Sequence, residues 1–310
     1  MAIITPPLII AGALKLDVEK TSFLVSMSLF VSGISTFIQC KRFGPVGARL
    51  LCIQGTSFSF IGPIITTGLM GGLPLIFGVC MAAAPVEMVI SRTFRYMRNI
   101  ITPLVSGIVV LLIGLSLIKV GVVSCGGGYG AMDNGTFGSW ENLSIAGLVL
   151  LSVLFFNRSK NKYLRMSSIV LGICLGYGLA FALGKVDMSS LNLNLLTSFN
   201  IPMPFKYGLD FNISSFIAIG LVYLITAIEA TGDVTANSMI SGLDIEGEGY
   251  VKRVSGGVLA DGFNSFLAGV FNSFPNSIFA QNNGIIQLTG VASRFVGYYI
   301  AAMLVLLGLF

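Results

Sequence analysis

Long apolar stretches follow one another along nearly the whole chain. A helix needs about 20 consecutive apolar residues to cross a bilayer, and most of the stretches approach that length. The segment Ile3–Leu14 is shorter, and we expect it to be the second half of a span rather than a signal peptide. Further spans are predicted, to within a few residues, at 21–39, 50–68, 72–91, 100–120, 141–156, 166–184, 213–232, 254–271, 273–291 and 295–310.

One of these stretches is interrupted by polar residues. Polar groups have no partners in lipid, so a segment of this kind must be buried by protein or line a cavity. We expect an extended piece at Ser277–Gln281, followed by a short helix capped by Asn282 or Asn283. The polar side chains of the stretch are Asn272, Ser273, Asn276, Ser277, Gln281, Asn282, Asn283, Gln287 and Thr289.

A second interruption occurs early in the chain. Leu50–Gln54 is predicted to be extended, and Gly55–Phe58 to begin a helix with a Thr or Ser cap. The two extended pieces could pair and so satisfy backbone groups that lipid cannot. Two such broken spans indicate a duplicated architecture, with both helix starts directed at one point.

Composition supports a membrane protein. Of 310 residues, 55% are hydrophobic and 10% are charged, and the mean hydropathy is +0.90. When successive loops are assigned to alternate sides, the basic residues are strongly asymmetric, which marks the richer side as cytoplasmic. That side carries Lys41, Arg42, Arg49, Arg92, Arg95, Arg98, Arg158, Lys160, Lys162, Arg165, Lys252, Arg253 and Arg294. The other side carries Lys15, Lys20, Lys119, Lys185 and Lys206.

This charge distribution indicates topology rather than a nucleic-acid-binding face. The absence of histidine removes His-based catalysis and the commonest metal ligand, so no metal site or cofactor is expected. The five cysteines are irregularly spaced, and we interpret them as small buried residues. The glycine run Gly126–Gly128 lacks the ending of a phosphate loop and is expected to form an external turn.

Four acidic residues lie within or beside predicted spans, where a charge costs about 2.5–3.5 kcal/mol on insertion scales. Glu229 and Asp233 are four residues apart and share a helix face. They could bind N–H groups of a substrate and couple to a proton, or instead lock helices together. Asp261 is a candidate for transport or for a structural polar network. Glu87 is expected to form an interfacial ion pair with Arg92.

Gln281 offers one acceptor and two donors at the centre of a broken span. An amide suits the edge of a flat heterocycle with mixed donors and acceptors. Phe58 and Phe279, each beside a break, could stack on such a ring, although most phenylalanines in this chain are expected to face lipid or the core.

Four motifs carry a specific resemblance that covers essentially the whole chain. They are Gln281–Gly290, Glu229–Asp233, Gln54–Phe58, and Ala260–Gly262 followed by Asn264-Ser265. The chain resembles the nucleobase–ascorbate transporters, also called nucleobase:cation symporter-2, in their bacterial xanthine/uric acid permease branch.

The resemblance implies an all-α polytopic membrane protein with fourteen spans in two inverted repeats of seven, and short paired strands in spans three and ten. It places a core domain at residues 1–99 and 211–310 and a gate domain at 100–210. The start of the first span, with the family's Gln-His pair, and everything after the start of span eleven are expected to be missing.

The resemblance also assigns residue roles. Glu229 and Gln281 would bind the purine edge. Phe58, Phe279 and Ala280 would line the pocket, with Ser57 beside it. Asp233 and Asp261 match coupling and gating positions, and Asn282 is grouped with them.

The expected function is proton-coupled uptake of xanthine, or next of urate, by an elevator mechanism in a plasma-membrane homodimer driven by the proton gradient. Four alternatives are a uracil or other nucleobase permease, a same-fold anion transporter, a channel and a membrane enzyme. Uracil-type members carry Glu at the Gln281 position. An anion site would need a cation near Gln281 or Ser57, and a channel would not need an acid and an amide together. An enzyme lacks a paired base, so none is expected.

Overall fold

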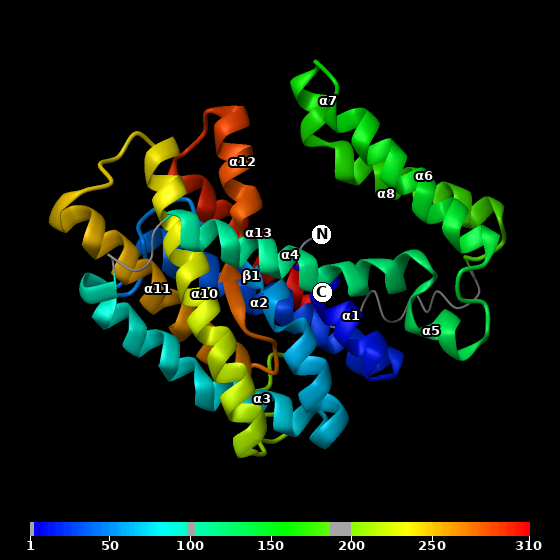
Figure 1. Ribbon diagram of the computed structural model, residues 1–310, viewed down its shortest axis with the longest axis horizontal. Helices are drawn as coiled ribbons and strands as arrows, with labels where there is room; N and C mark the ends of the chain where they lie inside the picture. Colours follow the sequence, from blue (N-terminus) through cyan, green and yellow to red (C-terminus); the bar gives the residue numbers. More distant parts are fainter. Residues whose placement is uncertain (1–2, 98–102, 187–199) are drawn as a thin grey trace. The chain divides into compact units, whose positions relative to one another are not determined.

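The computed structural model describes residues 3–97, 103–186 and 200–310, which are mostly helical (Figure 1). Four helical segments, α2, Phe58–Thr93, α6 and α10, are long and apolar enough to cross a membrane, and α8 and α13 are shorter apolar helices. The first half contains α1 (Thr5–Ala13), α2 (Val18–Lys41), β1 (Gln54–Thr56), the 3-10 turn η1 (Phe58–Phe60), α3 (Ile61–Met97) and α4 (Pro103–Cys125). Then come α5 (Gly128–Asp133), α6 (Trp140–Asn157), α7 (Lys162–Met166), α8 (Ser168–Ala182), α10 (Ile213–Ile240), α11 (Gly247–Val270), β2 (Asn276–Ile278), α12 (Ala280–Thr289) and α13 (Arg294–Leu309).

The predicted spans 50–68 and 72–91 are joined without a loop. Their helical parts meet inside α3 at Gly71 and Gly72, whose backbone angles are not helical. Gly72 has φ +68°, a conformation that glycine adopts without strain. The predicted domain boundary between residues 99 and 100, together with Arg98, falls in 98–102, outside the described residues.

Two very short strands pair antiparallel, with Gln54 opposite Ile278 and Thr56 opposite Asn276. The ladder extends at both ends, because Ser57 N donates to Pro275 O at 2.9 Å and Phe279 N to Ile53 O at 3.0 Å. Every residue of both strands is buried. Both extended pieces therefore differ slightly from prediction: the first begins later, and the second ends before Gln281.

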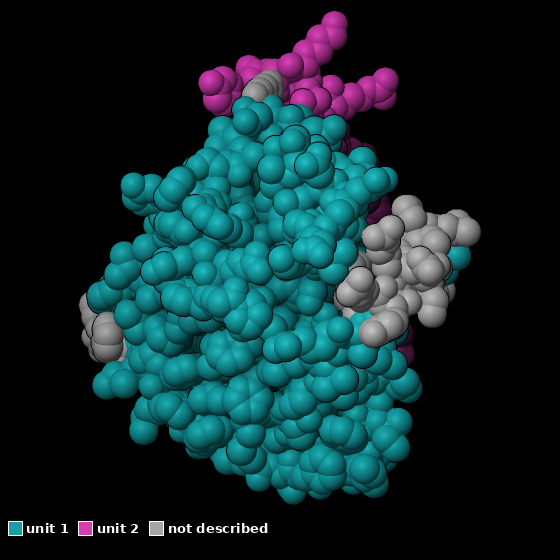
Figure 2. Space-filling model, turned by 90° about the vertical axis from the view of Figure 1, so that its left-hand side faces the viewer, with its two compact units in different colours: residues 1–114, 199–310 teal, residues 115–198 magenta. Residues whose placement is uncertain are grey.

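The chain divides into two compact units, coloured separately in Figure 2. The first, residues 1–114 and 199–310, contains both strands and has α3 packed against α10 and α11, and α2 against α13. The second, residues 115–198, pairs α6 with α8. Gly172 and Gly176 of α8 face Val153 and Val149 of α6, so small residues allow the close approach.

The cysteines only partly match the prediction. Cys40, Cys52 and Cys80 are buried free thiols, whereas Cys125 and Cys174 are exposed. The last two lie at the end of α4 and in α8, apolar helices with much exposed surface in this chain. Apolar sequence context alone does not distinguish a lipid-facing position from a core position.

A substitution at Gly33 tests how closely α2 packs against α13. A Cβ there would lie 2.7 Å from Ala301 O and 2.8 Å from Val305 N, which are backbone atoms that cannot easily move. We expect Gly33→Ala to lower the free energy of unfolding by about 1–3 kcal/mol through overpacking. The check is the thermal unfolding midpoint in detergent.

Gly12→Ala is the matched control, because a Cβ at Gly12 in α1 meets nothing within 4 Å. It should be neutral or slightly stabilising, since alanine favours a helix over glycine. Equal midpoints for the two variants would contradict the close packing of α2 and α13.

Candidate functional site

The antiparallel strand pair places one helix start at each end of its ladder, with η1 following β1 and α12 following β2. Ser57 links β1 to η1 and caps that turn, because its side-chain oxygen accepts a hydrogen bond from Ser59 N at 3.3 Å. The expected serine cap is therefore present, although the helical turn begins at Phe58 rather than at Gly55. Phe279 is the N-cap of α12 and provides no side-chain cap.

The prediction that Asn282 or Asn283 caps α12 is wrong. Both lie inside the helix and are buried, because their amides are used to hold α12 in place. Asn282 Nδ2 donates to Leu51 O at 2.6 Å, and Asn283 Nδ2 donates to Asp233 O at 3.3 Å. Asn237 of α10 donates to both Leu51 O and Asn283 Oδ1. These amides join α12, α10 and the segment before β1.

Glu229 faces the first helix start. It is partly buried in α10, and its Oε2 accepts a hydrogen bond from Ser59 Oγ at 3.2 Å. Asp233, one turn further along α10, is 9% exposed and interacts electrostatically with Glu229. An acid and a hydroxyl thus converge where η1 meets α10, and together they offer acceptors to a ligand's N–H groups.

Two further acidic side chains, Asp261 and Glu87, are completely buried. Asp261 of α11 is fully buried and accepts a hydrogen bond from the Gln54 amide, and Gln54 Oε1 in turn accepts from Asn264 Nδ2 at 2.5 Å. Glu87 of α3 is also fully buried and interacts with Asp261 and Thr226. The predicted interfacial ion pair of Glu87 with Arg92 is therefore wrong, because the side chain turns inward while Arg92 is exposed.

The remaining predicted residues lie at the two helix starts: Phe58 begins η1, and Phe279, Ala280 and Gln281 lie at the start of α12. Gln281 and Ala280 are exposed, and Phe279 and Phe58 are partly buried. Among the described residues no hydrogen bond joins Gln281 to Glu229, and no ring pair joins Phe58 to Phe279. The Phe279 ring instead covers Gly55, where an added Cβ would lie 2.6 Å from it. The structure therefore brings Ser59, Glu229 and Asp233 into one cluster, and the Gln281 side chain makes no hydrogen bond within the described part of the chain.

Four residues were not singled out for the site roles that the structure suggests: Ser59, Gln54, Asn264 and Phe60. Phe60 is buried edge-on against Tyr223, with ring centroids 4.7 Å apart. The sequence does contain a signal for Gln54, because an amide side chain inside an apolar broken span needs a hydrogen-bond partner, as Gln281 does. No local signal marks Ser59, whose contact with Glu229 spans 170 positions.

Comparison with known proteins gives consistent matches over the full chain. A sequence model of a protein family, described as "Permease family", matches residues 1–310 of this chain. The chain is 49% identical to xanthine permease XanP of Escherichia coli K12 over 100% of its length and 69% of that protein. It is 48% identical to XanQ of the same organism, over 99% of this chain and 67% of that protein. It is 34% identical to uric acid permease PucJ of Bacillus subtilis, over 98% of this chain and 67% of that protein.

A substitution at Gln54 tests how much the buried hydrogen-bond network of Gln54, Asp261 and Asn264 stabilises the fold. Replacing it with Ala removes the amide that bridges Asp261 and Asn264 and leaves both polar groups buried. We expect a loss of about 1–3 kcal/mol in unfolding free energy for each group left without a partner. Thermal unfolding in detergent measures it.

Gln287→Ala on the exposed side of α12 is the control, since it removes the same atoms without breaking any hydrogen bond that the structure shows among its described residues. A Gln54→Ala variant as stable as this control would show that the network contributes nothing to the fold.

Proposed function

Because this chain belongs to the permease family of nucleobase–ascorbate transporters, in its xanthine and uric acid branch, we propose that it takes up a purine nucleobase, xanthine first. It is a multi-pass cell membrane protein. The observation that supports a mechanism beyond the family assignment is the contact of Ser59 with Glu229 at the start of η1.

The chemistry of that cluster favours a neutral heterocycle. Xanthine presents several N–H groups and carbonyl oxygens on its edges, which match a carboxylate acceptor and a hydroxyl or amide donor. Glu229 would accept from ring N–H groups. Gln281, whose side chain is exposed and free to turn, would pair with a carbonyl and N–H edge. Phe58, Phe279 and the backbone of Ala280 would enclose the ring, with Ser57 holding the turn below it.

Urate is the second candidate, because PucJ, a relative at 34% identity, is a uric acid permease. Urate differs from xanthine by one oxygen on the same ring system, and a pocket rejects such an addition only weakly. An anion carrier fits less well, since the converging groups at η1 and α10 are acidic or neutral. A uracil permease fits less well because position 281 is Gln rather than Glu.

The buried carboxyl pair supports proton coupling. Glu87 and Asp261 are both fully buried and interact electrostatically, and a hydrogen bond between the two carboxyl groups would require that one of them hold a proton. Two negative charges in contact away from water are costly, which favours that shared proton. We propose that release of this proton accompanies release of the purine, with Asp233 linking the pair to Glu229.

The mechanism would be of the elevator type. We propose that residues 1–99 and 211–310 form the core domain that carries the substrate, in inverted repeats of seven spans with strands in spans three and ten. Residues 100–210 would belong to the gate domain of a homodimer. The proton gradient, rather than a cofactor, would supply the driving force, and Asn282 would hold α12 to the moving core.

Glu229→Gln in the complete protein should abolish uptake of radiolabelled xanthine, because an amide cannot replace a charged acceptor for two N–H groups. Glu248→Gln, an exposed acid paired with Lys252, should transport like the wild type. Uptake is measured in cells with surface expression matched by immunoblot. Wild-type uptake by the Glu229 variant would remove this residue from the binding site.

Glu87→Gln should reduce uptake driven by the proton gradient while leaving xanthine binding within about threefold of wild type, because the amide keeps the shape but cannot release a proton. Uptake with and without an uncoupler is compared with equilibrium binding in detergent. Loss of binding together with uptake would assign Glu87 a structural role, and unchanged uptake would exclude it from coupling.

A further inference from the structure

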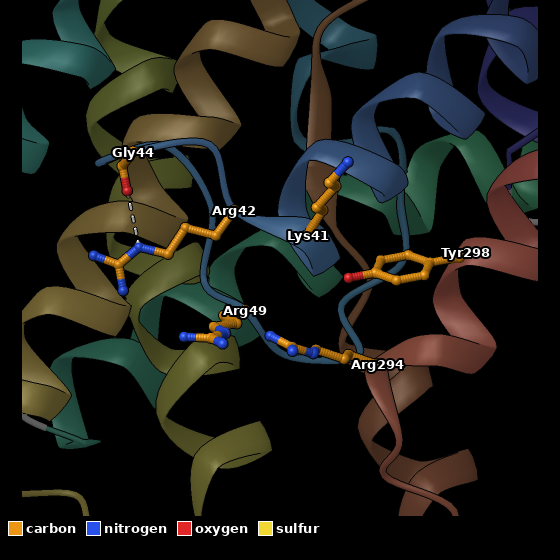
Figure 3. Close-up of a pocket in the computed structure, with 6 residues that line it drawn as sticks. All are labelled: Lys41, Arg42, Gly44, Arg49, Arg294 and Tyr298. Carbon is orange, nitrogen blue, oxygen red and sulfur yellow. Dashed lines mark hydrogen bonds between the residues drawn. The ribbon is translucent and has the colours of Figure 1, made fainter.

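A cavity of about 460 Å³ lies at the end of α2 and the beginning of α13, and none of its residues belongs to the purine site. Figure 3 shows that its lining comes from the end of α2, the loop after it and the first turns of α13. The lining residues are Lys41, Arg42, Gly44, Arg49, Arg294 and Tyr298. Four of the six carry a positive charge.

The fold holds these side chains in place. Arg42 and Arg49 both adopt left-handed backbone conformations, with φ +62° and +61°, on either side of a tight turn. Arg49 N donates to Gln39 O at 3.0 Å, which fixes the loop to the end of α2. Gly297 brings α13 against Cys40 and Leu51, where a Cβ would collide. The cavity is therefore built on packed elements.

The four cations, Lys41, Arg42, Arg49 and Arg294, have no acidic ion-pair partner among the residues that the structure describes. Arg42 Nε donates to Gly44 O at 3.1 Å. The positive-inside rule places basic residues on one side of the membrane but does not require them to line the same cavity. Membrane topology alone therefore does not explain why these four residues line one cavity. Mutual repulsion would be relieved by a bound anion.

The surroundings indicate which anion. Ser293 leaves the N-terminus of α13 without a side-chain cap, so free N–H groups add to the positive potential. Phe43 and Phe295, whose ring centroids lie 5.1 Å from Lys41 Nζ and 5.4 Å from Arg294 Cζ, are 47% and 58% exposed, as expected of aromatics at a membrane interface. The charge distribution of the loops places this end on the cytoplasmic side, where anionic lipids are concentrated.

We propose that this pocket binds the phosphate group of an anionic phospholipid of the cytoplasmic leaflet. Arg49 and Arg294 provide paired donors that match phosphate oxygens, and Arg42 and Lys41 add positive charge. Tyr298, whose ring packs 5.3 Å from that of Phe37, supplies a hydroxyl at the wall. The lipid would hold the end of α2 to α13.

The test titrates phosphatidylglycerol into the purified complete protein in neutral detergent at fixed ionic strength and follows the thermal unfolding midpoint. Phosphatidylcholine and inorganic phosphate are titrated in parallel. The variants are Arg49→Gln/Arg294→Gln, the charge-conserving Arg49→Lys/Arg294→Lys, and the control Arg158→Gln/Lys160→Gln. The control removes the same charge from exposed residues of the same predicted side.

We expect phosphatidylglycerol to raise the midpoint of the wild type and the control at similar concentrations, with phosphatidylcholine having little effect. The Gln pair should need roughly tenfold more lipid for the same shift, and the Lys pair an intermediate amount. If the Arg49→Gln/Arg294→Gln variant does not fold, the comparison of the Arg49→Lys/Arg294→Lys variant with the wild type still tests the proposal.

Two results would overturn the proposal. A shift of equal size in the pocket variants and the control would mean that the lipid acts elsewhere. A full shift with inorganic phosphate alone would mean that the occupant is a soluble anion and not a lipid.

Discussion

The backbone of two interrupted spans must find hydrogen-bond partners without help from water, and the pairing of β1 with β2 provides them. A buried peptide group without a partner costs several kcal/mol in hydrocarbon, so neither strand is stable there alone. The three-residue ladder and its two flanking bonds satisfy both segments at once. Everything at the candidate site depends on this pairing, because it determines where η1 and α12 begin.

The amide side chains extend the same principle beyond the ladder. Asn282 and Asn237 both donate to Leu51 O, and Gln54 bridges Asp261 and Asn264. Polar groups in the first unit are therefore linked into networks, which are costly to break in a low-dielectric interior. The acids are placed by these networks: Glu229 beside the first helix start, and Glu87 with Asp261 behind it. One scaffold can in this way hold an acid at a helix start and a second, fully buried acidic pair.

The sequence was informative where a local conflict was visible. Polar residues inside an apolar run revealed both breaks and drew attention to Glu229, Gln281 and Asp261. Long-range geometry was not accessible in the same way. A strand three residues long has too little periodicity to define its register, and the direction of Glu87 depends on how α3 packs against α11. Asn282 and Asn283 resembled helix caps because the partners that occupy their amides come from distant segments.

The register of the strand pair is the most direct test of this account. Thr56 and Asn276 are opposite each other at a position where antiparallel side chains approach most closely, so cysteines there should form a disulfide in membranes under mild oxidation. A pair shifted by one residue, Thr56→Cys with Ser277→Cys, should not, because alternate residues point to opposite faces. We predict rapid cross-linking of the first pair alone, read as protection from alkylation. Equal cross-linking of both pairs, or of the shifted pair only, would contradict the pairing on which the site is built.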